Sequence, residues 1–402
     1  MSIKRIIGVL LVCCLILVVF ACQNIDSDVV ITTDTITSTS TSELPPEPRT
    51  YSAKFFPLAD YFFVSTLVGA HNNLVYILHQ DDSINADYGR GGFPLWQPNR
   101  LVSITDGNAV TELWTALRYV AQEDGWHYFK YDEVYDTTLM PNGDIALLIR
   151  TTARWIYRPH EHECGLYPTP IPEPQLPRPT TRTEYQQYTL LFLAPCGTIT
   201  NEIDFDALIV GFSQGNWIIL ALSDGRLLVW NNWLNAYFFF FDPMNDTQLH
   251  PVATWYRNEN WINDILVTPN DELLLLIGSW SPYPTPSGMS HWEIQNLCLD
   301  TGEISTISYG YGFRVAEIQN GITNDIYLLF YPNPGSGMDN RLAGIIGIDI
   351  TSGEQAVLFT WNEFDVRTNF QQFIICTSDN LYILSNIYIP QLSVALVRLT
   401  WD

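Results

Sequence analysis

One local pattern recurs along this chain: an apolar run, a tight polar turn and a second apolar run. Its clearest copy extends from Thr137 to Ile149, with the turn at Pro141-Asn142-Gly143-Asp144. Asn, Asp and Gly accept the positive φ angles that tight β-hairpins need, and second runs rich in Leu, Ile and Val are typical of strands buried on both faces. Copies lie at residues 70–78, 140–148, 222–229, 268–276, 321–329 and 377–384. The sequence therefore predicts six β-hairpins.

A second type of hairpin follows the first. Its strands alternate apolar and polar residues more clearly, as the outer strands of a small sheet do. The copies lie at residues 101–113, 191–203, 238–249, 296–307 and 347–358. The copy at 238–249 departs most from the pattern, because Met244-Asn245 stand where the others have Gly. Each pair of hairpins makes a unit of four strands.

Four-stranded units at this spacing resemble the blades of a β-propeller. The turn residues Gly197, Asn245, Gly302 and Gly353 lie 48, 57 and 51 residues apart. The resemblance covers about residues 50–402 and implies an all-β, six-bladed propeller, with a seven-bladed ring as the alternative. No stretch shows a sustained helical periodicity, and residues 110–120 come nearest to one. We expect residues 51–402 to form this domain.

The two ends of the repeat region complement each other. The sixth unit ends with Val394–Asp402, which is its third strand, so a fourth strand is missing. Residues 50–57 form an extra strand-like segment before the first unit. Pairing these segments removes two exposed strand edges, so we expect the N-terminal strand to close the last blade. Trp401-Asp402 resembles the end of a strand in WD repeats but occurs once, so it assigns no subfamily.

The first 22 residues predict export. Lys4-Arg5 precede an apolar core from Ile6 to Phe20, as in a secretory signal. Val19-Phe20-Ala21-Cys22 resembles a bacterial lipobox, which implies that Cys22 carries a lipid and becomes the new N-terminus. The alternative is an uncleaved anchor helix. Residues 23–50, rich in Thr, Ser and Pro, predict a disordered tether, so both alternatives place the domain outside the cytoplasm at a bacterial membrane.

The charge balance is strongly acidic. The chain has 43 acidic and 19 basic residues, and the first 22 residues hold two of the basic ones and none of the acidic ones, which leaves the rest at −26. Such a charge repels phosphate backbones, so we expect no nucleic-acid partner. No dinucleotide or phosphate-binding glycine motif is present, and we expect no cofactor.

The longest connections all join the second strand to the third, or one unit to the next, and in a propeller these lie on one face. They are residues 80–99, 115–135, 155–184, 250–261, 278–292 and 331–341. Loops on a rigid scaffold carry binding residues disproportionately, and aromatic side chains suit sugars and peptides. The candidate ligand-binding residues on this loop-rich face are Trp96, Trp126, Trp255, Arg257, Trp261, Trp280, Tyr283, Trp292, Arg314, Arg341 and Trp361.

Histidines and cysteines give weaker signals. His160 and His162 share one side of an extended segment and are the weak candidates for a metal, although no metal site is favoured. Cys164 and Cys196 fall in the same unit, so they could form a disulfide outside the cytoplasm. Cys298 and Cys376 follow strand patterns and are expected to be buried.

These features favour a non-catalytic binding protein or scaffold, tethered to the membrane, with a protein or glycan ligand on the loop-rich face. The scaffold alternative resembles the lipoprotein propellers that assist outer-membrane protein insertion, in leader and repeats only. The alternative from another class is a carbohydrate-active propeller enzyme, a glycoside hydrolase or lyase. The motif Gly211-Phe-Ser-Gln-Gly215 resembles a nucleophile elbow, but a strand pattern follows where that elbow needs a helix.

Overall fold

The computed structural model describes most of the repeat region. The residues described are 51–57, 65–80, 99–105, 109–123, 126–157, 180–210, 217–232, 236–255, 261–279, 291–299, 301–311, 313–321, 325–332, 344–360, 367–376, 380–389 and 391–401. All of them belong to one compact unit, Pro45–Asp402. The leader, Cys22 and the expected tether lie outside the described residues and stay predictions.

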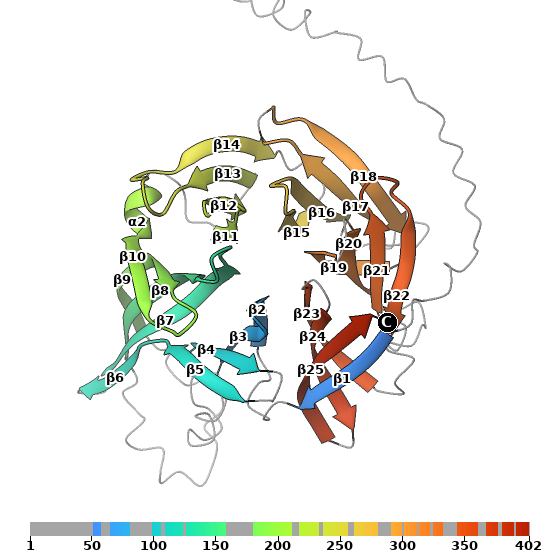
Figure 1. The fold of residues 1–402 in the computed structure, drawn as a ribbon. Helices are drawn as coiled ribbons and strands as arrows, with labels where there is room; N and C mark the ends of the chain where they lie inside the picture. Colours follow the sequence, from blue (N-terminus) through green and yellow to red (C-terminus); the bar gives the residue numbers. More distant parts are fainter. Residues whose placement is uncertain are drawn as a thin grey trace, which may run out of the picture. The chain divides into compact units, whose positions relative to one another are not determined.

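The described strands form six antiparallel sheets, five of four strands and one of five (Figure 1). The first sheet holds β2 (Ser65–His71), β3 (Leu74–Gln80), β4 (Asn99–Thr105) and β5 (Val110–Thr115). The second holds β6 (Arg118–Glu123), β7 (Trp126–Leu139), β8 (Ile145–Tyr157), β9 (Thr180–Leu193) and β10 (Ile199–Asp204). The third holds β11 (Trp217–Ala221), β12 (Leu227–Asn232), β13 (Ala236–Phe241) and β14 (His250–Trp255).

The remaining sheets follow the same order. The fourth holds β15 (Trp261–Val267), β16 (Leu273–Ser279), β17 (His291–Leu297) and β18 (Ile304–Tyr311). The fifth holds β19 (Phe313–Asn320), β20 (Asp325–Pro332), β21 (Gly344–Asp349) and β22 (Gln355–Thr360). The sixth holds β23 (Arg367–Cys376), β24 (Asn380–Ile389), β25 (Gln391–Trp401) and β1 (Tyr51–Pro57). One four-residue helix, α2 (Phe205–Leu208), follows β10.

Each predicted hairpin is present, with a strand on either side of its turn. Several turns contain a residue with the expected positive φ angle, among them Gly143 at 88°, Asn73 at 62° and Asp271 at 59°. The second strand of each unit is buried on both faces, as Ile145, Ala146, Leu147 and Leu148 show with no exposed surface. The outermost strands β5 and β10 are mostly exposed. The strand pattern predicted from the sequence is confirmed.

Neighbouring sheets pack face to face around a common centre, which makes this unit a β-propeller (Figure 1). The innermost strands contact one another in the pairs β2–β7, β7–β11, β15–β19, β19–β23 and β23–β2. The third and fourth sheets meet through a core that includes Trp230, Phe238 and Ile265. The five four-stranded sheets have the strand number of a propeller blade, and β6–β10 has one strand more. No seventh sheet occurs among the described residues.

The first strand of the unit pairs with the last. β1 runs antiparallel to β25, with Tyr51 opposite Trp401 and Pro57 opposite Ala395. β1 therefore takes the place of the missing outer strand beside β23–β25. This is the strand pairing that the sequence predicts.

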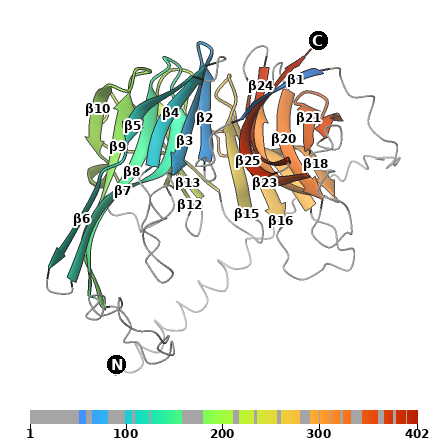
Figure 2. The ribbon, with the colours of Figure 1, turned by 90° about the horizontal axis from the view of Figure 1, so that it is seen from below.

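The second sheet corrects the prediction of a long loop at residues 115–135. Most of that segment is strand: β6 pairs with β7 from Arg118 opposite Tyr131 to Glu123 opposite Trp126. The first half of β7 and the second half of β8 form an extension of the sheet, which β9 continues (Figure 2). Residues 250–255 are likewise strand β14, which corrects the first part of the predicted loop at 250–261.

Among the described residues, no helix has the length and apolar content needed to span a membrane.

Candidate functional site

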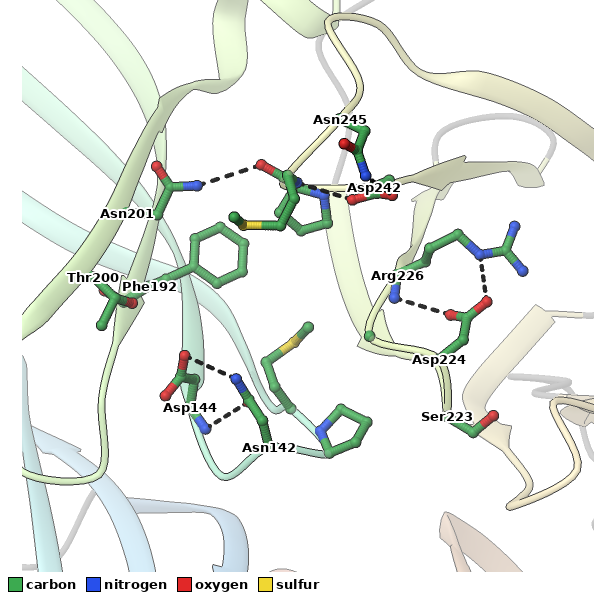
Figure 3. Close-up of a pocket in the computed structure, with 15 residues that line it drawn as sticks. Asn142, Asp144, Phe192, Thr200, Asn201, Ser223, Asp224, Arg226, Asp242 and Asn245 are labelled. Carbon is green, nitrogen blue, oxygen red and sulfur yellow. Dashed lines mark hydrogen bonds and ion pairs between the residues drawn. The ribbon is translucent and has the colours of Figure 1, made fainter.

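The candidate site is a groove of about 710 Å³ between the hairpin turns of the second and third sheets (Figure 3). One wall comes from the β7–β8 turn and from β9 and β10, and carries Asn142, Asp144, Phe192, Thr200 and Asn201. The other wall comes from the β11–β12 and β13–β14 turns. It carries Ser223, Asp224, Gly225, Arg226, Asp242, Pro243, Met244 and Asn245. The groove, called the turn groove below, lies on the hairpin-turn face, which the sequence predicted to be plain.

The turn groove exists where the repeat departs from its pattern. In the second sheet, the N–H of Gly197 donates to Ala194 O at 2.8 Å and closes a glycine turn. Asn245 takes the place of that glycine in the third sheet, and its N–H donates to Asp242 O at 3.3 Å. The Asp242 carboxylate supports the turn by accepting the Met244 N–H at 2.9 Å and the Asn245 side-chain amide at 2.8 Å. This turn leaves Met244 82% exposed beside the groove.

Two aspartates that line the turn groove, Asp242 and Asp224, are held in the ionised form by their neighbours. Hydrogen bonds from the Asn245 amide and the Met244 N–H lower the pKa of Asp242. Partial burial of Asp224 acts to raise its pKa, but the backbone and guanidinium of Arg226 outweigh this and lower it. Arg226 Nε lies 2.6 Å from Asp224 Oδ2, so that pair is neutral overall. The groove also carries the carboxylates of Asp144 and Asp242, and Arg226 is the one basic residue among those that line it.

Hydrogen bonds between sheets fix the walls of the turn groove. The Asn201 amide donates to Pro243 O at 3.4 Å and joins the second sheet to the third (Figure 3). The hydroxyl of Ser223 donates to Asp271 Oδ2 at 2.7 Å and joins the third sheet to the fourth. Phe192 is only 5% exposed and belongs to the core between the second and third sheets. The site is therefore held in shape by its own scaffold.

A second group of carboxylates lies on the innermost strands. Burial raises the pKa of Asp136 on β7 to about 7, against the effect of N–H donors from Ile219 and Thr137, and repulsion from Asp264 adds to it. Burial also raises the pKa of Asp264 on β15 to about 7, against N–H donors from Ile318 and Ile265. Some surface of each residue is exposed, but the strands around them displace most of the water that would hydrate a charge.

Both inner carboxylates join neighbouring sheets. Asp136 Oδ2 accepts the N–H of Ile219 on β11 at 2.6 Å, and Asp264 Oδ2 accepts the N–H of Ile318 on β19 at 2.9 Å. Each aspartate follows a bulge in its own strand, which turns the side chain toward the next sheet. Their position is explained by this structural role.

Two of the predicted ligand-binding residues lie in the core. Trp255 is 7% exposed in the core of the third and fourth sheets, and Trp292 is 1% exposed in the core of the fourth and fifth. The prediction that Trp255 and Trp292 lie at a loop surface is wrong, because both belong to strands whose apolar side chains pack between sheets. Trp126 is half-buried at the start of β7. The positions or side chains of the others lie outside the described residues, namely Trp96, Arg257, Trp261, Trp280, Tyr283, Arg314, Arg341 and Trp361.

The extension of the second sheet carries an aromatic cluster. The ring of Tyr128 lies 6.0 Å from that of Tyr119 and 4.9 Å from that of Trp155, centroid to centroid. Trp155 Nε1 donates to Glu184 Oε1 at 2.6 Å, and Tyr119 is 54% exposed. These aromatic side chains belong to the face that the sequence predicted to be loop-rich, but they stand on strands.

The predicted thiol and metal positions are only partly described. Cys196 is exposed in the β9–β10 turn, and Cys164 lies outside the described residues, so their pairing stays a prediction. Cys298 is exposed, against expectation, because it follows the last residue of β17 and opens a turn. The side chain of Cys376 lies outside the described part, as do His160, His162 and the Gly211–Gly215 motif. The described residues include no group of three or more His, Cys, Asp or Glu arranged to hold a metal.

Sequence reasoning missed the residues of the turn groove. One signal pointed to them: an apolar Met244 in a turn where the other units have glycine or small polar residues. A single exposed apolar residue is common on protein surfaces, so this signal becomes informative only beside the other lining residues of the groove. The remaining walls belong to ordinary turns, which acquire a binding shape only when two sheets lie side by side.

No family model matches this chain, and no curated protein matches it. Solved structures with a partly similar fold include puromycin hydrolase, at 10% identity and a TM-score of 0.43, over 80% of this chain and 50% of that one. The chain thus spans about half the length of that enzyme. Polysaccharide lyase Uly1 matches at 10% identity and 0.41, over 90% and 94% of the two chains. Trypanosoma rangeli sialidase matches at 9% and 0.41, over 85% and 55%. Overlaps this partial do not indicate a shared function.

Proposed function

We propose that this chain is a lipid-anchored, extracytoplasmic binding protein. Its body is a six-bladed propeller in which the five-stranded sheet β6–β10 is the sixth blade with an added strand. Cys22 carries the lipid, residues 23–50 form the tether, and the ligand is a protein or glycan. The leader sequence supports this location, and the acidic charge argues against nucleic acid as a partner.

One observation favours binding over catalysis: the carboxylates of the turn groove are committed to turn hydrogen bonds that lower the pKa of Asp224 and Asp242. A general acid needs a carboxyl whose pKa is raised toward neutrality. Asp242, held ionised by its own turn while Asp224 is paired with Arg226, instead presents a fixed charge to a ligand. We therefore assign the turn groove to ligand binding.

The aromatic cluster on the second sheet is a second proposed binding surface. Tyr119, Tyr128 and Trp155 present rings to solvent or partly to solvent, and rings of this kind stack on sugars and anchor peptides. A glycan array probed with the full chain tests this surface. Wild type should bind a glycan that Trp155→Ala loses, and the absence of any bound glycan leaves protein as the ligand class.

The location is tested by fractionation. Wild type should sediment with membranes and incorporate labelled fatty acid, whereas Cys22→Ser should incorporate none. Protease added to intact cells should reach the propeller in wild type. A chain that fractionates with the cytosol would contradict the proposal.

A second candidate function is a carbohydrate-active enzyme, favoured by the raised pKa of Asp136 and Asp264 and by their mutual repulsion. Turnover of polysaccharides by wild type, abolished in Asp136→Asn and Asp264→Asn with the fold retained by circular dichroism, would establish it. Absence of turnover across hydrolase and lyase substrates leaves the two aspartates their structural role.

A further inference from the structure

We propose that the turn groove binds a basic, extended segment of a partner protein. This inference rests on the binding role proposed above and names the class of ligand. The groove combines an apolar wall with the carboxylates of Asp144, Asp224 and Asp242, against which Arg226, paired with Asp224, is the one basic lining residue. A chain with lysine or arginine beside an apolar residue matches both features.

The apolar part of the groove suits a side chain of variable shape. Met140 and Phe192 are 7% and 5% exposed and border the groove from the core, whereas Met244 stands 82% exposed at its edge. Methionine is flexible and polarisable, so it adapts to different apolar partners. Burial of Met244 under a ligand removes apolar surface from water at no cost to the fold.

The carboxylates retain capacity for an incoming cation. Asp242 already accepts the Met244 N–H and the Asn245 amide, and Asp144 accepts the Asn142 amide at 3.1 Å. A carboxylate offers about four acceptor positions, so both side chains can accept further donors from an ammonium or guanidinium group. Figure 3 shows Asp144 and Asp242 on opposite walls, from the second and third sheets.

Charge complementarity indicates which of three chains fits the turn groove: the tether, a second copy of this protein or a different protein. The expected tether, residues 23–50, holds five acidic residues and one basic residue, Arg49, so it is repelled by the groove. A second copy of the chain is strongly acidic as well and offers little complementary charge. The ligand is therefore a different, basic chain.

Peptide binding to the full-length protein in phosphatidylcholine nanodiscs tests this inference. The probes are the fluorescent hexapeptide KLQKLQ and its acidic counterpart ELQELQ, read by anisotropy at low and high salt, with empty nanodiscs as the blank. Wild type should bind KLQKLQ, more weakly at high salt, and should not bind ELQELQ. Asp242→Asn and Asp144→Asn should each weaken KLQKLQ binding roughly five- to tenfold. Met244→Ser should weaken it at both salt concentrations.

Asp349→Asn is the matched control. Asp349 opens the β21–β22 turn, and its carboxylate accepts the N–H groups of Thr351 at 2.7 Å and Ser352 at 2.9 Å. The variant Asp349→Asn removes the same charge from a hairpin turn of another sheet, so binding of KLQKLQ should not change. Equal losses in Asp349→Asn and Asp242→Asn would overturn the inference, since only the total charge would matter. Spermidine that competes with KLQKLQ equally in wild type and Met244→Ser would also overturn it, because a polyamine needs no apolar contact.

The two proposals fail in different ways. If groove variants leave KLQKLQ binding unchanged while the chain still captures a glycan or an envelope protein, the groove assignment fails and the binding function stands. If neither peptide, glycan nor envelope protein binds, the binding function fails as well.

Discussion

Two contacts between neighbouring sheets show how the turn groove arises. In the β9–β10 turn, a Cβ added to Gly197 would lie 2.3 Å from Leu113 O of the preceding sheet. In the β21–β22 turn, a Cβ on Gly353 would lie 3.1 Å from Ile307 O, again of the preceding sheet. These turns lie close against their neighbours because glycine has no side chain. The β13–β14 turn has Asn245 in this position and meets its neighbour through the Asn201 amide instead.

Glycine permits a close contact but does not impose it. Gly302 has a φ of +71°, yet a Cβ there would meet nothing within 4 Å. The approach of two sheets therefore depends on the whole turn and not on one residue. The β13–β14 turn has the larger residues Pro243, Met244 and Asn245 here, and these residues line the groove between the two sheets.

The inner strands show no such difference. Asp136 joins the second sheet to the third and Asp264 joins the fourth to the fifth, with the same bond to a backbone N–H. The outer turns of the second and third sheets are thus open while their inner strands are tied. A propeller can acquire a groove at its rim without loss of contact at its centre.

The largest loss of stability is expected in the sixth sheet, whose outer strand β1 comes from the other end of the chain. Deletion of Tyr51–Phe56 removes β1 and exposes β25, so we expect a loss on the order of 5 kcal/mol, comparable to the whole stability of a typical domain, and aggregation. Thermal melting and size-exclusion chromatography measure it. Deletion of residues 23–44 is the control and should leave the melting curve unchanged. An unchanged curve for the β1 deletion would contradict the closing role of this strand.

Gly197→Ala breaks a closed contact. Its φ of +86° costs alanine about 1–2 kcal/mol, and the clash with Leu113 O adds a similar amount, so we expect a loss of about 3 kcal/mol. Gly302→Ala meets the same backbone cost without a clash and should lose about 1–2 kcal/mol. Chemical denaturation measures both. Equal losses would mean that the close approach at Gly197 carries no energetic weight.

The inner ties predict a dependence on pH. The pKa of Asp136 and Asp264 is about 7 in the folded protein against an ordinary value of 3.8, so the folded state binds protons more tightly. Their contribution to stability is complete below pH 3.8 and is lost as the pH rises through 7. The double variant Asp136→Asn, Asp264→Asn should remove this dependence. Between pH 5 and 8, wild type should lose roughly 1–3 kcal/mol relative to the double variant in denaturant titrations. A parallel pH course of the two proteins would exclude these groups as the cause.

The smallest effect on stability is expected from closing the open contact. Met244→Ser with Asn245→Gly gives the β13–β14 turn a sequence closer to that of the β9–β10 turn. Stability should change by about 1 kcal/mol or less, because Met244 is exposed. Binding of KLQKLQ should nevertheless fall, since the groove loses the exposed apolar side chain of Met244. Unchanged peptide binding would show that the groove does not depend on this turn.

The strands could be predicted because their signals are local. A turn residue with positive φ, such as Gly143 or Asp271, and an apolar run beside it determine a hairpin wherever they occur. The extension of the second sheet was missed although Asp124-Gly125, between β6 and β7, is itself a hairpin signal. Aromatic and charged residues on both faces of β7 hid the alternation there.

The candidate site could not be predicted in the same way. The turn groove is formed by turns that are about 100 residues apart, from Asn142 to Asn245, and each turn looks ordinary by itself. Two tryptophans were wrongly predicted to bind a ligand for a related reason. Trp255 and Trp292 flank connections in the sequence, but their large apolar rings are used to fill the space between sheets.

The pairing of β1 with β25 has a consequence for synthesis. Tyr51 lies opposite Trp401, so the first strand must wait for 350 further residues before its partner exists. At roughly 5–20 residues per second, this wait lasts about 20 to 70 seconds. During that time the chain carries two unpaired strand edges, and no earlier stopping point completes the sixth sheet. A chain released before β25 is made would therefore leave β1 without its partner strand and both edges exposed to other chains.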